Sequence, residues 1–162
     1  MRKSFVLDSM LGRLAKWLRI MGYDAVYSPY FSDDELIEKA SKAHAILLTR
    51  DRLLARLAEL RGIRAITLPE DLAGQLVRLA TLGCIELKVD LNKTRCPVCN
   101  AKLMKVGRSR VVGRVPQGII EHYDEFWLCP ECGKVYWPGS HLRSIVKFLE
   151  RLQALKRQYS GR

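Results

Sequence analysis

The first 83 residues alternate between short apolar runs and longer amphipathic segments. The four apolar runs are 4–7, 25–27, 45–48 and 65–68, each with the length of a β-strand. Apolar residues repeat at helical spacing over 11–21, 32–43, 52–60 and 69–82. The unbroken run at 45–48 is typical of a strand that is covered on both faces. Four strand–helix repeats predict a parallel sheet with helices packed on both faces.

From residue 84 the pattern loses this regularity. Residues 85–91 fit either a strand or a linker, and the short runs 111–112 and 126–128 predict strands of a small module. From Ser140, a predicted N-cap, apolar residues repeat as on a helix that docks on the main domain. The predicted organisation is a main domain over 1–83, a linker strand and small module over 84–139, and a C-terminal helix over 140–162.

Two pairs of cysteines lie within this small module. Cys96 and Cys99 form one CxxC pair, and Cys129 and Cys132 form the other, with 29 residues between the pairs. Two such pairs supply the tetrahedral four-sulfur shell of a structural zinc ion. Disulfides or a redox dithiol are the alternative, but the matching pairs, each with a proline after its first cysteine, favour zinc. A closed shell has no open position, so this zinc is predicted to hold the fold rather than to catalyse.

The charge of the chain is unevenly distributed. The formal net charge of the 162 residues is +11, with +3 on residues 1–83 and +8 on residues 84–162. The stretch 101–120 contains five basic residues and no acidic one. This asymmetry favours a polyanionic partner, for which nucleic acid is the commonest candidate. A solvated basic surface is the alternative interpretation.

Targeting signals are not recognisable in the sequence. No apolar run approaches the roughly 20 residues of a membrane span, and the N-terminus reaches a charge too early for a signal peptide. The predicted zinc thiolates and the remaining Cys84, expected in the core, suggest a reducing compartment. We therefore expect a cytoplasmic protein without membrane contact.

Acidic residues follow the predicted strands at the edge where parallel sheets bind ligands, beyond the carboxyl ends. Asp8 ends the first strand, Asp51 follows the third, and Asp34 opens the second helix. Carboxylates that converge from separate segments repel one another unless a cation lies between them, which predicts a hard divalent ion. Magnesium or manganese at this edge would activate a water and neutralise charge on a phosphate.

Each of these acids also has a structural interpretation. Asp51 could N-cap the helix that follows it. Asp34 and Asp71 lie in first turns of helices, where acids complement the macrodipole. Asp8 is harder to explain in this way, because Ser9 could have capped the next helix instead.

Basic and aromatic residues add two further patterns. Arg13, Lys16 and Arg19 recur every three residues on the first predicted helix, as a solvated face or as a phosphate-binding face near Asp8. The aromatic residues near the second cysteine pair could stack on unpaired bases if exposed, or form a small core if buried. These aromatic residues are Trp127, Tyr136 and Trp137.

Several segments match longer motifs. They are FVLDSMLGRLAKWLR at 5–19, DDEL at 33–36, ILLTRDR at 46–52 and, beside the cysteine pairs, VYWPGSH at 135–141. Together they resemble the mut-seven C-terminal ribonuclease family, which belongs to the PIN-like nucleases and carries a zinc-ribbon extension. The resemblance implies an α/β protein with a PIN-like three-layer α/β/α parallel sheet, a C-terminal zinc ribbon and a final helix.

The resemblance also implies roles for individual residues. Carried over by position, the metal-binding acids are Asp8, Asp34 and Asp51, and a fourth acid is either Glu38 or Asp71. We expect a Mg²⁺- or Mn²⁺-dependent ribonuclease that hydrolyses phosphodiester bonds of single-stranded RNA. In this hypothesis Arg13 helps to hold the phosphate, and the zinc ribbon and the basic stretch 102–114 dock the RNA.

A non-catalytic RNA-binding or assembly module with a PIN-like shell is the alternative function. Specificity supplied by a ribosomal or protein partner, and pairing of two copies in a homodimer, stay open. A preference for RNA over DNA does not follow from the acids, because a metal-activated water needs no 2′-hydroxyl as nucleophile.

Overall fold

The computed structural model describes residues 2–160, the last two by their backbone alone, so that 161–162 of the predicted C-terminal segment lie outside the described residues. The N-terminal strands are β1 (Ser4–Leu7), β2 (Asp24–Tyr27), β3 (Ile46–Thr49) and β4 (Ala65–Thr67). The helices that follow them are α1 (Gly12–Ile20), α2 (Asp33–Ala43), α3 (Arg52–Leu60) and α4 (Leu72–Thr81). The predicted alternation of strands and helices is confirmed.

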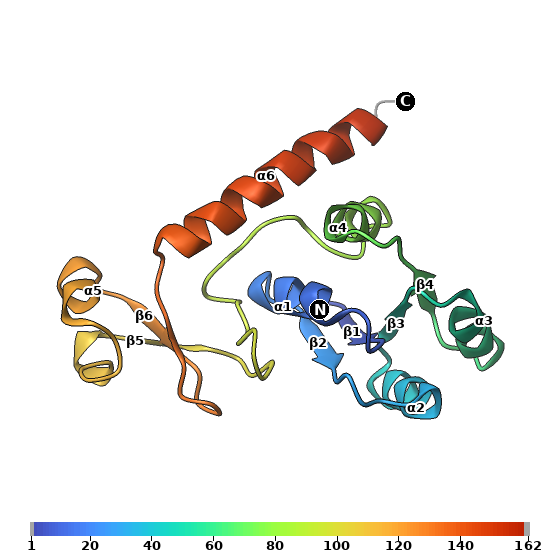
Figure 1. Cartoon of the computed structure of the whole chain (residues 1–162), viewed down its shortest axis with the longest axis horizontal. Coiled ribbons are helices and arrows are strands. Elements are labelled where there is room, and N and C mark those ends of the chain that lie inside the picture. Colours follow the sequence, from blue (N-terminus) through green and yellow to red (C-terminus); the bar gives the residue numbers. More distant parts are fainter. Residues whose placement is uncertain (1, 161–162) are drawn as a thin grey trace.

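The four strands form one parallel sheet in the order β2-β1-β3-β4 (Figure 1). In the two central pairings, Val6 of β1 lies opposite Val26 of β2 on one side and Leu47 of β3 on the other. The chain moves outward from β1 to β2, and then crosses back to build β3 and β4 on the opposite side of β1. The strand order therefore reverses between β1 and β3, and ligands of such sheets bind beyond the carboxyl ends at this point.

Helices cover both faces of the sheet. Leu7 and Leu48 pack with α1 and α4 on one face, whereas Val6 and Leu47 pack with α2 and α3 on the other. Neighbouring residues of a strand point to opposite faces, so each central strand contributes to two cores. The predicted α/β fold, a parallel sheet between two layers of helices, is confirmed.

The long C-terminal helix α6 (Ser140–Ser160) packs along α4 and adds Ile145, Leu149 and Leu152 to the first core. Its first hydrogen bond runs from the Arg143 N–H to the carbonyl oxygen of Gly139, so Ser140 is the first helical residue and not the N-cap that we predicted. None of the described helices has the length and apolarity that a membrane crossing requires.

Side-chain caps set the starts of the N-terminal helices. At α2, Ser32 and Glu35 form a capping box, in which each side chain binds the other residue's backbone N–H. At α4 the Asp71 carboxylate accepts a hydrogen bond of 2.7 Å from the Gly74 N–H, so this helix begins at Leu72 rather than at Pro69. The predicted start was too early because this carboxylate satisfies a free N–H group of the first turn.

After α4 the chain passes through a linker into the small module. Residues 85–91 carry no strand, and the linker interpretation holds, with Cys84, Ile85 and Leu87 buried in the first core. The module contains an antiparallel sheet in the order β5-β6-β7. Its elements are β5 (Met104–Val106), a 3-10 turn (Arg108–Arg110), α5 (Gln117–His122), β6 (Phe126–Leu128) and β7 (Val135–Tyr136).

The core of the module consists of three buried residues, Val111, Ile120 and Phe126. The predicted strand at 126–128 is present. The predicted strand at 111–112 is wrong, because Val111 follows the 3-10 turn and enters the core from a loop. Val111 is buried but Val112 is exposed, so the apolar pair contains one core residue and no strand.

Candidate active site and metal centre

The carboxylate of Asp8 lies directly beyond β1, where the strand order reverses. Its Oδ2 accepts a hydrogen bond of 2.8 Å from the hydroxyl of Thr49 at the end of β3. Its Oδ1 accepts one of 2.6 Å from the backbone N–H of Ser9. The Asp8 N–H donates to the carbonyl oxygen of Leu48 at 3.0 Å, so the strand pairing continues up to this residue. Both central strands therefore hold this half-buried acid in place.

The backbone of Asp51 contacts the same Thr49 hydroxyl. The Asp51 N–H donates to the Thr49 hydroxyl oxygen at 2.9 Å, so one side chain contacts both acid-bearing segments. Asp51 Oδ1 accepts hydrogen bonds from the N–H groups of Leu53 and Leu54, which confirms its interpretation as the N-cap of α3. Its Oδ2 has no hydrogen bond from the described residues, and this oxygen can face a ligand.

Sequence reasoning missed Thr49 as part of this site. Its side chain is completely buried, which is unusual for a hydroxyl that does not belong to a backbone cap. The available signal was the polar residue that ends an otherwise apolar run, two positions before Asp51.

The loop that carries Asp8 is supported from β2. The Tyr27 hydroxyl donates to the carbonyl oxygen of Ser9 at 2.8 Å. A Cβ atom at Gly12, the first residue of α1, would lie 2.8 Å from this hydroxyl oxygen, closer than atoms approach. The glycine therefore allows α1 to start against Tyr27, and this contact fixes the loop between β1 and α1.

The other predicted acids lie apart from this network. Asp34 is exposed on α2, and its Oδ1 lies 3.7 Å from a guanidinium nitrogen of Arg61. Glu38 pairs with Lys42 at 2.6 Å, and this hydrogen bond lowers the pKa of Glu38. Asp71 caps α4. The structure thus brings together Asp8 and the Asp51 segment, but not Asp34, Glu38 or Asp71.

The donor set at the sheet edge fits a hydrated divalent ion. Asp8, Asp34 and Asp51 do not form a close group of ligand atoms; within the described part of the chain, only the cysteines do. Magnesium keeps several of its waters and binds through one or two carboxylates together with substrate phosphates. Asp8 and Asp51 could supply these carboxylates, since the Asp8 carboxylate and the Asp51 backbone N–H both bind the Thr49 hydroxyl.

The four cysteines of the two CxxC pairs converge. Their sulfur atoms all lie within 4.8 Å of one another. Cys99 and Cys129 are 3.3 Å apart at their sulfurs, and Cys96 and Cys132 are 3.6 Å apart. Cys96 and Cys129 are buried, whereas the other two are exposed. This cluster can bind a metal such as zinc and is consistent with the predicted zinc ribbon.

Proximity makes the thiols unequal. Burial opposes the ionisation of Cys96, but hydrogen bonds from the Tyr136 hydroxyl and the Cys99 backbone outweigh it and lower the pKa of Cys96 to about 7. A hydrogen bond from the Ala101 backbone favours the thiolate of Cys99. The hydrogen bond between the Cys99 and Cys129 thiols and desolvation outweigh it and raise the pKa of Cys99 to about 12. The negative charge of the first thiolate opposes ionisation of the neighbouring thiols. A bound metal cation offsets this repulsion and allows the other thiols to lose their protons.

Arg19 fastens the first cysteine pair to the N-terminal domain. This buried side chain donates at 2.9 Å to the carbonyl oxygen of Ala25 in β2 and at 2.9 Å to that of Pro97 between the cysteines. Burial lowers the pKa of Arg19, while the neighbouring Cys96 favours its charged form. Arg19 therefore belongs neither to a solvated face nor to a phosphate-binding face, the two alternatives that the sequence suggested.

The remaining basic residues of α1 face the ribbon. Arg13 and Lys16 line a groove between α1, the ribbon and α6, together with Tyr136 and Trp137. These two aromatic residues are half-buried, whereas Trp127 is buried, and its indole N–H has no partner among the described residues. The predicted burial is therefore confirmed for Trp127, whereas Tyr136 and Trp137 lie between the two predicted alternatives.

The basic stretch 102–114 is partly neutralised by acids of the same module. Lys105 pairs with Glu125 at 2.9 Å, and Arg108 pairs with Asp124 at 2.7 Å. Arg108 also donates at 3.0 Å to the carbonyl oxygen of Tyr123, so its guanidinium is engaged within the fold. Fewer of these charges are free for a polyanion than the sequence suggested.

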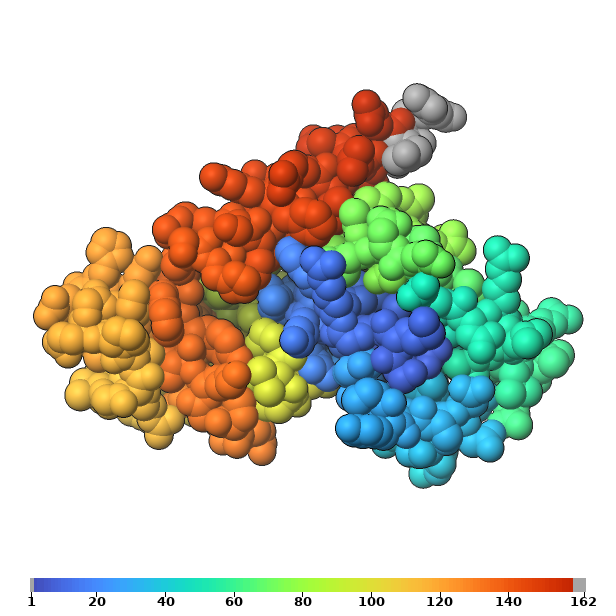
Figure 2. All heavy atoms as spheres, viewed as in Figure 1, coloured from blue at the N-terminus to red at the C-terminus, as the bar shows by residue number. Residues whose placement is uncertain are grey.

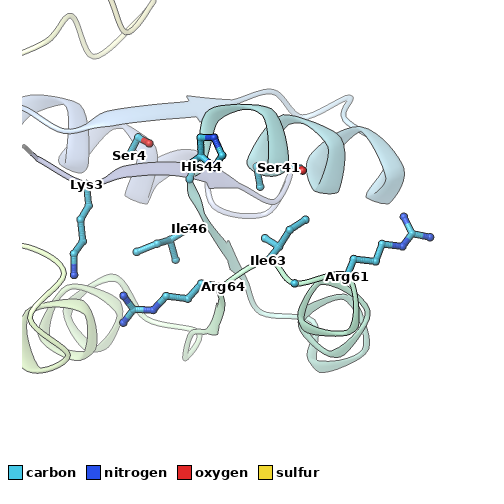
Figure 3. Close-up of a pocket in the computed structure, with 11 residues that line it drawn as sticks. Lys3, Ser4, Ser41, His44, Ile46, Arg61, Ile63 and Arg64 are labelled. Atoms are coloured by element: carbon cyan, nitrogen blue, oxygen red, sulfur yellow. The ribbon is translucent and has the colours of Figure 1, made fainter.

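A second basic region lies at the opposite, amino-terminal edge of the sheet. Lys3, His44, Arg61 and Arg64 line a cavity of about 480 Å³. Figure 3 shows Ile46 and Ile63 of this cavity between the basic side chains. Helices α2 and α3 end here, and basic residues complement the negative ends of their dipoles.

Comparison with known proteins identifies one family. A family model described as Mut7-C RNAse domain matches residues 3–149. No curated protein and no solved structure matches the chain. The matched span contains the acids at the sheet edge, the four cysteines and the first half of α6.

Proposed function

The chain belongs to the Mut7-C RNAse domain family, and on this premise we propose that it is a metal-dependent ribonuclease that hydrolyses phosphodiester bonds of single-stranded RNA. The observation that carries the proposal is the position of Asp8. Its carboxylate lies at the reversal of strand order and is oriented by Ser9 and by a buried hydroxyl of the neighbouring strand. This support holds the carboxylate at the edge of the sheet where ligands bind.

Asp8 and Asp51 would hold the magnesium or manganese ion, and Asp34 would complete the set. The pair between Asp34 and Arg61 is long and solvent-exposed, with 86% of the Asp34 side chain accessible. Exposed pairs of this kind are worth at most about 1 kcal/mol, so Asp34 can turn toward a ligand at small cost. Glu38 and Asp71, each engaged elsewhere, are the candidates for a fourth acid.

The protein's own side chains position the substrate for hydrolysis. When bound, the ion would supply Lewis-acid polarisation of the phosphate and a water of lowered pKa. Thr49 and Ser9 fix both oxygens of Asp8, so the carboxylate need not reorganise during the reaction. Arg13, in the first turn of α1, would bind a non-bridging phosphate oxygen.

Exposed apolar side chains at the same edge support an unpaired substrate. Met10 follows Asp8, Tyr30 lies in the loop after β2, and Leu53 lies in the first turn of α3. Their exposed fractions are 64%, 89% and 82%. Unpaired bases offer flat apolar faces to such side chains, whereas the bases of a duplex are stacked on one another.

The cysteine cluster has a separate, structural role in this proposal. Four thiolates would close the shell of a zinc ion and leave no position for substrate. The thiols, including the free and buried Cys84, suit a reducing compartment such as the cytoplasm.

The proposal is tested with Asp8→Asn and a labelled single-stranded RNA. The wild type is expected to cleave the RNA with Mg²⁺ or Mn²⁺ and not with EDTA. Asp8→Asn should slow cleavage by about 100-fold or more, in the range seen when a transition-state contact is removed. Asp124→Asn, the same change at an exposed acid of the ribbon, should retain activity.

Thermal unfolding and RNA affinity of Asp8→Asn should match those of the wild type. Equal cleavage by the wild type and Asp8→Asn would refute the assignment of Asp8. Salt-sensitive RNA binding without cleavage under any divalent ion would instead establish the non-catalytic RNA-binding module.

A further inference from the structure

An apolar groove bordered by basic residues lies between the N-terminal domain and the ribbon. It is a groove of about 520 Å³ between α1, the ribbon and α6. In Figure 2 the surface of α1 lies between the ribbon and the rest of the N-terminal domain, below α6. The residues that carry the argument are Arg13, Lys16, Trp17, Lys134, Tyr136 and Trp137.

We propose that this groove binds the single-stranded RNA that extends from the scissile phosphate. Phosphates would lie along Arg13, Lys16 and Lys134, and bases would pack against the aromatic side chains. The inference rests on the proposed ribonuclease function and adds to it the path of the substrate.

The charges at the groove are available to a ligand. Arg13, Lys16 and Lys134 are exposed, and none of them forms an ion pair with a described acidic residue. In the stretch 102–114, by contrast, Lys105 and Arg108 are already paired. A polyanion gains more from free cations than from cations that it must first separate from carboxylates.

The aromatic side of the groove is held in position. The Tyr136 hydroxyl lies 3.3 Å from the Cys96 sulfur, within hydrogen-bonding distance, so the ring is anchored at the cysteine cluster. A Cβ atom at Gly139 would lie 3.0 Å from the indole nitrogen of Trp137, which shows how closely the indole packs on this backbone. Rings fixed before binding lose little entropy when a base packs on them.

The groove leads to the candidate active site. Arg13 lies in the first turn of α1, which starts just after Asp8 at the carboxyl edge. Lys16, Trp17 and Ile20 continue along the same face of the helix. From Arg13 to Ile20 this face extends about 10 Å at 1.5 Å per residue. RNA bound along α1 would therefore present a phosphate next to Asp8.

The amino-edge cavity lined by Lys3, His44 and Arg64 is the competing site for RNA. Its lining includes residues at the starts of β1 and β3, so it lies at the opposite edge of the sheet from Asp8. The carboxyl-terminal ends of α2 and α3, which close it, disfavour an anion. This cavity therefore serves as the alternative outcome of the experiment.

Binding is measured apart from cleavage, in the full-length, zinc-loaded Asp8→Asn protein with EDTA-free buffer and a fluorescein-labelled single-stranded RNA. The double variant Lys16→Ala/Lys134→Ala is compared with the matched variant Lys39→Ala/Lys147→Ala, which removes two exposed lysines outside both the groove and the basic stretch 102–114. The groove variant should bind about tenfold more weakly, and its log–log salt slope should fall by about 1.4, as two lost phosphate contacts require. The control variant should stay near the parent protein in both quantities.

Photocrosslinking of the same protein to an RNA with 5-iodouridine provides the second measurement. Crosslinked peptides are expected to contain Trp17, Tyr136 or Trp137. Crosslinks near Lys3 and His44, or equal loss of affinity in both double variants, would overturn the proposal. Failure of the wild type to cleave RNA would refute the ribonuclease function alone, because RNA binding in the groove is tested separately by affinity and by the position of crosslinks.

Discussion

A single buried hydroxyl organises the candidate active site. Thr49 donates to the carboxylate of Asp8 and accepts from the N–H of Asp51, so it links the two segments that end at the reversal of strand order. Partners that orient metal ligands commonly change metal affinity or activity by 10–100-fold when they are removed. We infer that Thr49 acts through Asp8 as a positioning residue.

Thr49→Val should lower ribonuclease activity by about 10–100-fold. Valine keeps the shape and the β-strand preference of threonine, so the sheet should persist while Asp8 loses its hydroxyl partner. The required Mn²⁺ concentration should rise, which is measured by titrating the ion in the cleavage assay. A purely structural role of Thr49 would leave this titration unchanged.

Thr67→Val is the matched control for this change. Thr67 lies opposite Thr49 in the register of β3 and β4, and its side chain makes no hydrogen bond among the described residues. Thr49→Ser should restore most of the activity, because the hydroxyl returns. Full activity of Thr49→Val, or equal loss in Thr67→Val, would contradict the positioning role.

Some residues of the candidate site could be predicted from the sequence, and others could not. Asp8 and Asp51 were identified because an acid after an apolar run is visible in the sequence itself. Thr49 was missed, since a threonine at the end of a strand is common and its partner lies 41 positions away. The capping role of Asp51 was anticipated because caps depend on neighbours in the chain.

At the scale of elements, helix α1 connects the parts of the molecule. Leu14 and Leu18 bury one side of it against the sheet. Arg19 reaches the carbonyl oxygens of β2 and of the first cysteine pair. Arg13 and Lys16 border the groove. Small displacements of α1 should therefore affect both the candidate active site at the carboxyl edge of the sheet and the ribbon.

Arg19→Met should destabilise the contact between the ribbon and the N-terminal domain. The change leaves the carbonyl oxygens of Ala25 and Pro97 without their donors, at a cost of about 3 kcal/mol of unfolding free energy. Release of zinc to a colorimetric chelator should become faster, because the first cysteine pair is less constrained. Urea unfolding and the rate of zinc release measure the two effects.

Arg56→Met provides the control, since Arg56 is exposed on α3. This variant should change the unfolding free energy by less than about 0.5 kcal/mol. Unaltered stability and zinc release in Arg19→Met would show that the ribbon docks without this side chain.

Long elements were predicted better than short ones. The helices of the N-terminal domain have nine to eleven residues, enough turns for apolar periodicity to appear. Strands β5 and β7 and helix α5, with three, two and six residues, were not predicted. Elements of this length show no period, and here the cysteine cluster and three buried residues determine the path of the chain.

The whole molecule is built on cores of very different size. Two large cores hold the parallel sheet between its helices, whereas the core cluster of the ribbon contains three buried residues. A core this small does not offset the entropy of ordering the module, and small modules of this kind depend on a metal. Stability of the ribbon should therefore depend on zinc, and that of the sheet should not.

Removal of zinc should unfold the ribbon and leave the sheet folded. Protein purified in zinc should contain one ion per chain by mass spectrometry of the metal. After chelation, hydrogen exchange should become fast in 96–137 and stay slow in β1 and β3. RNA affinity should fall as well, because the ribbon forms one wall of the groove.

Cys84→Ala is the control for the cysteine ligands. Cys84 is buried in the first core, outside the cluster, and the variant should keep its zinc. Cys129→Ala should lose it. A ribbon whose amides stay protected after complete removal of the metal would show that its small core suffices.

The amino-acid sequence by itself determined the order of strands and helices in the N-terminal domain, the two cysteine pairs and the acids at the strand ends. These features depend on periodicity and on short spacings, which act between neighbours in the chain. Only the tertiary structure decided that Thr49 joins Asp8 to Asp51 and that Arg19 links the ribbon to β2. It also decided which basic side chains beside the groove stay without an acidic partner. Such relations arise where segments far apart in the chain meet, and burial and charge pairing there depend on the assembled fold.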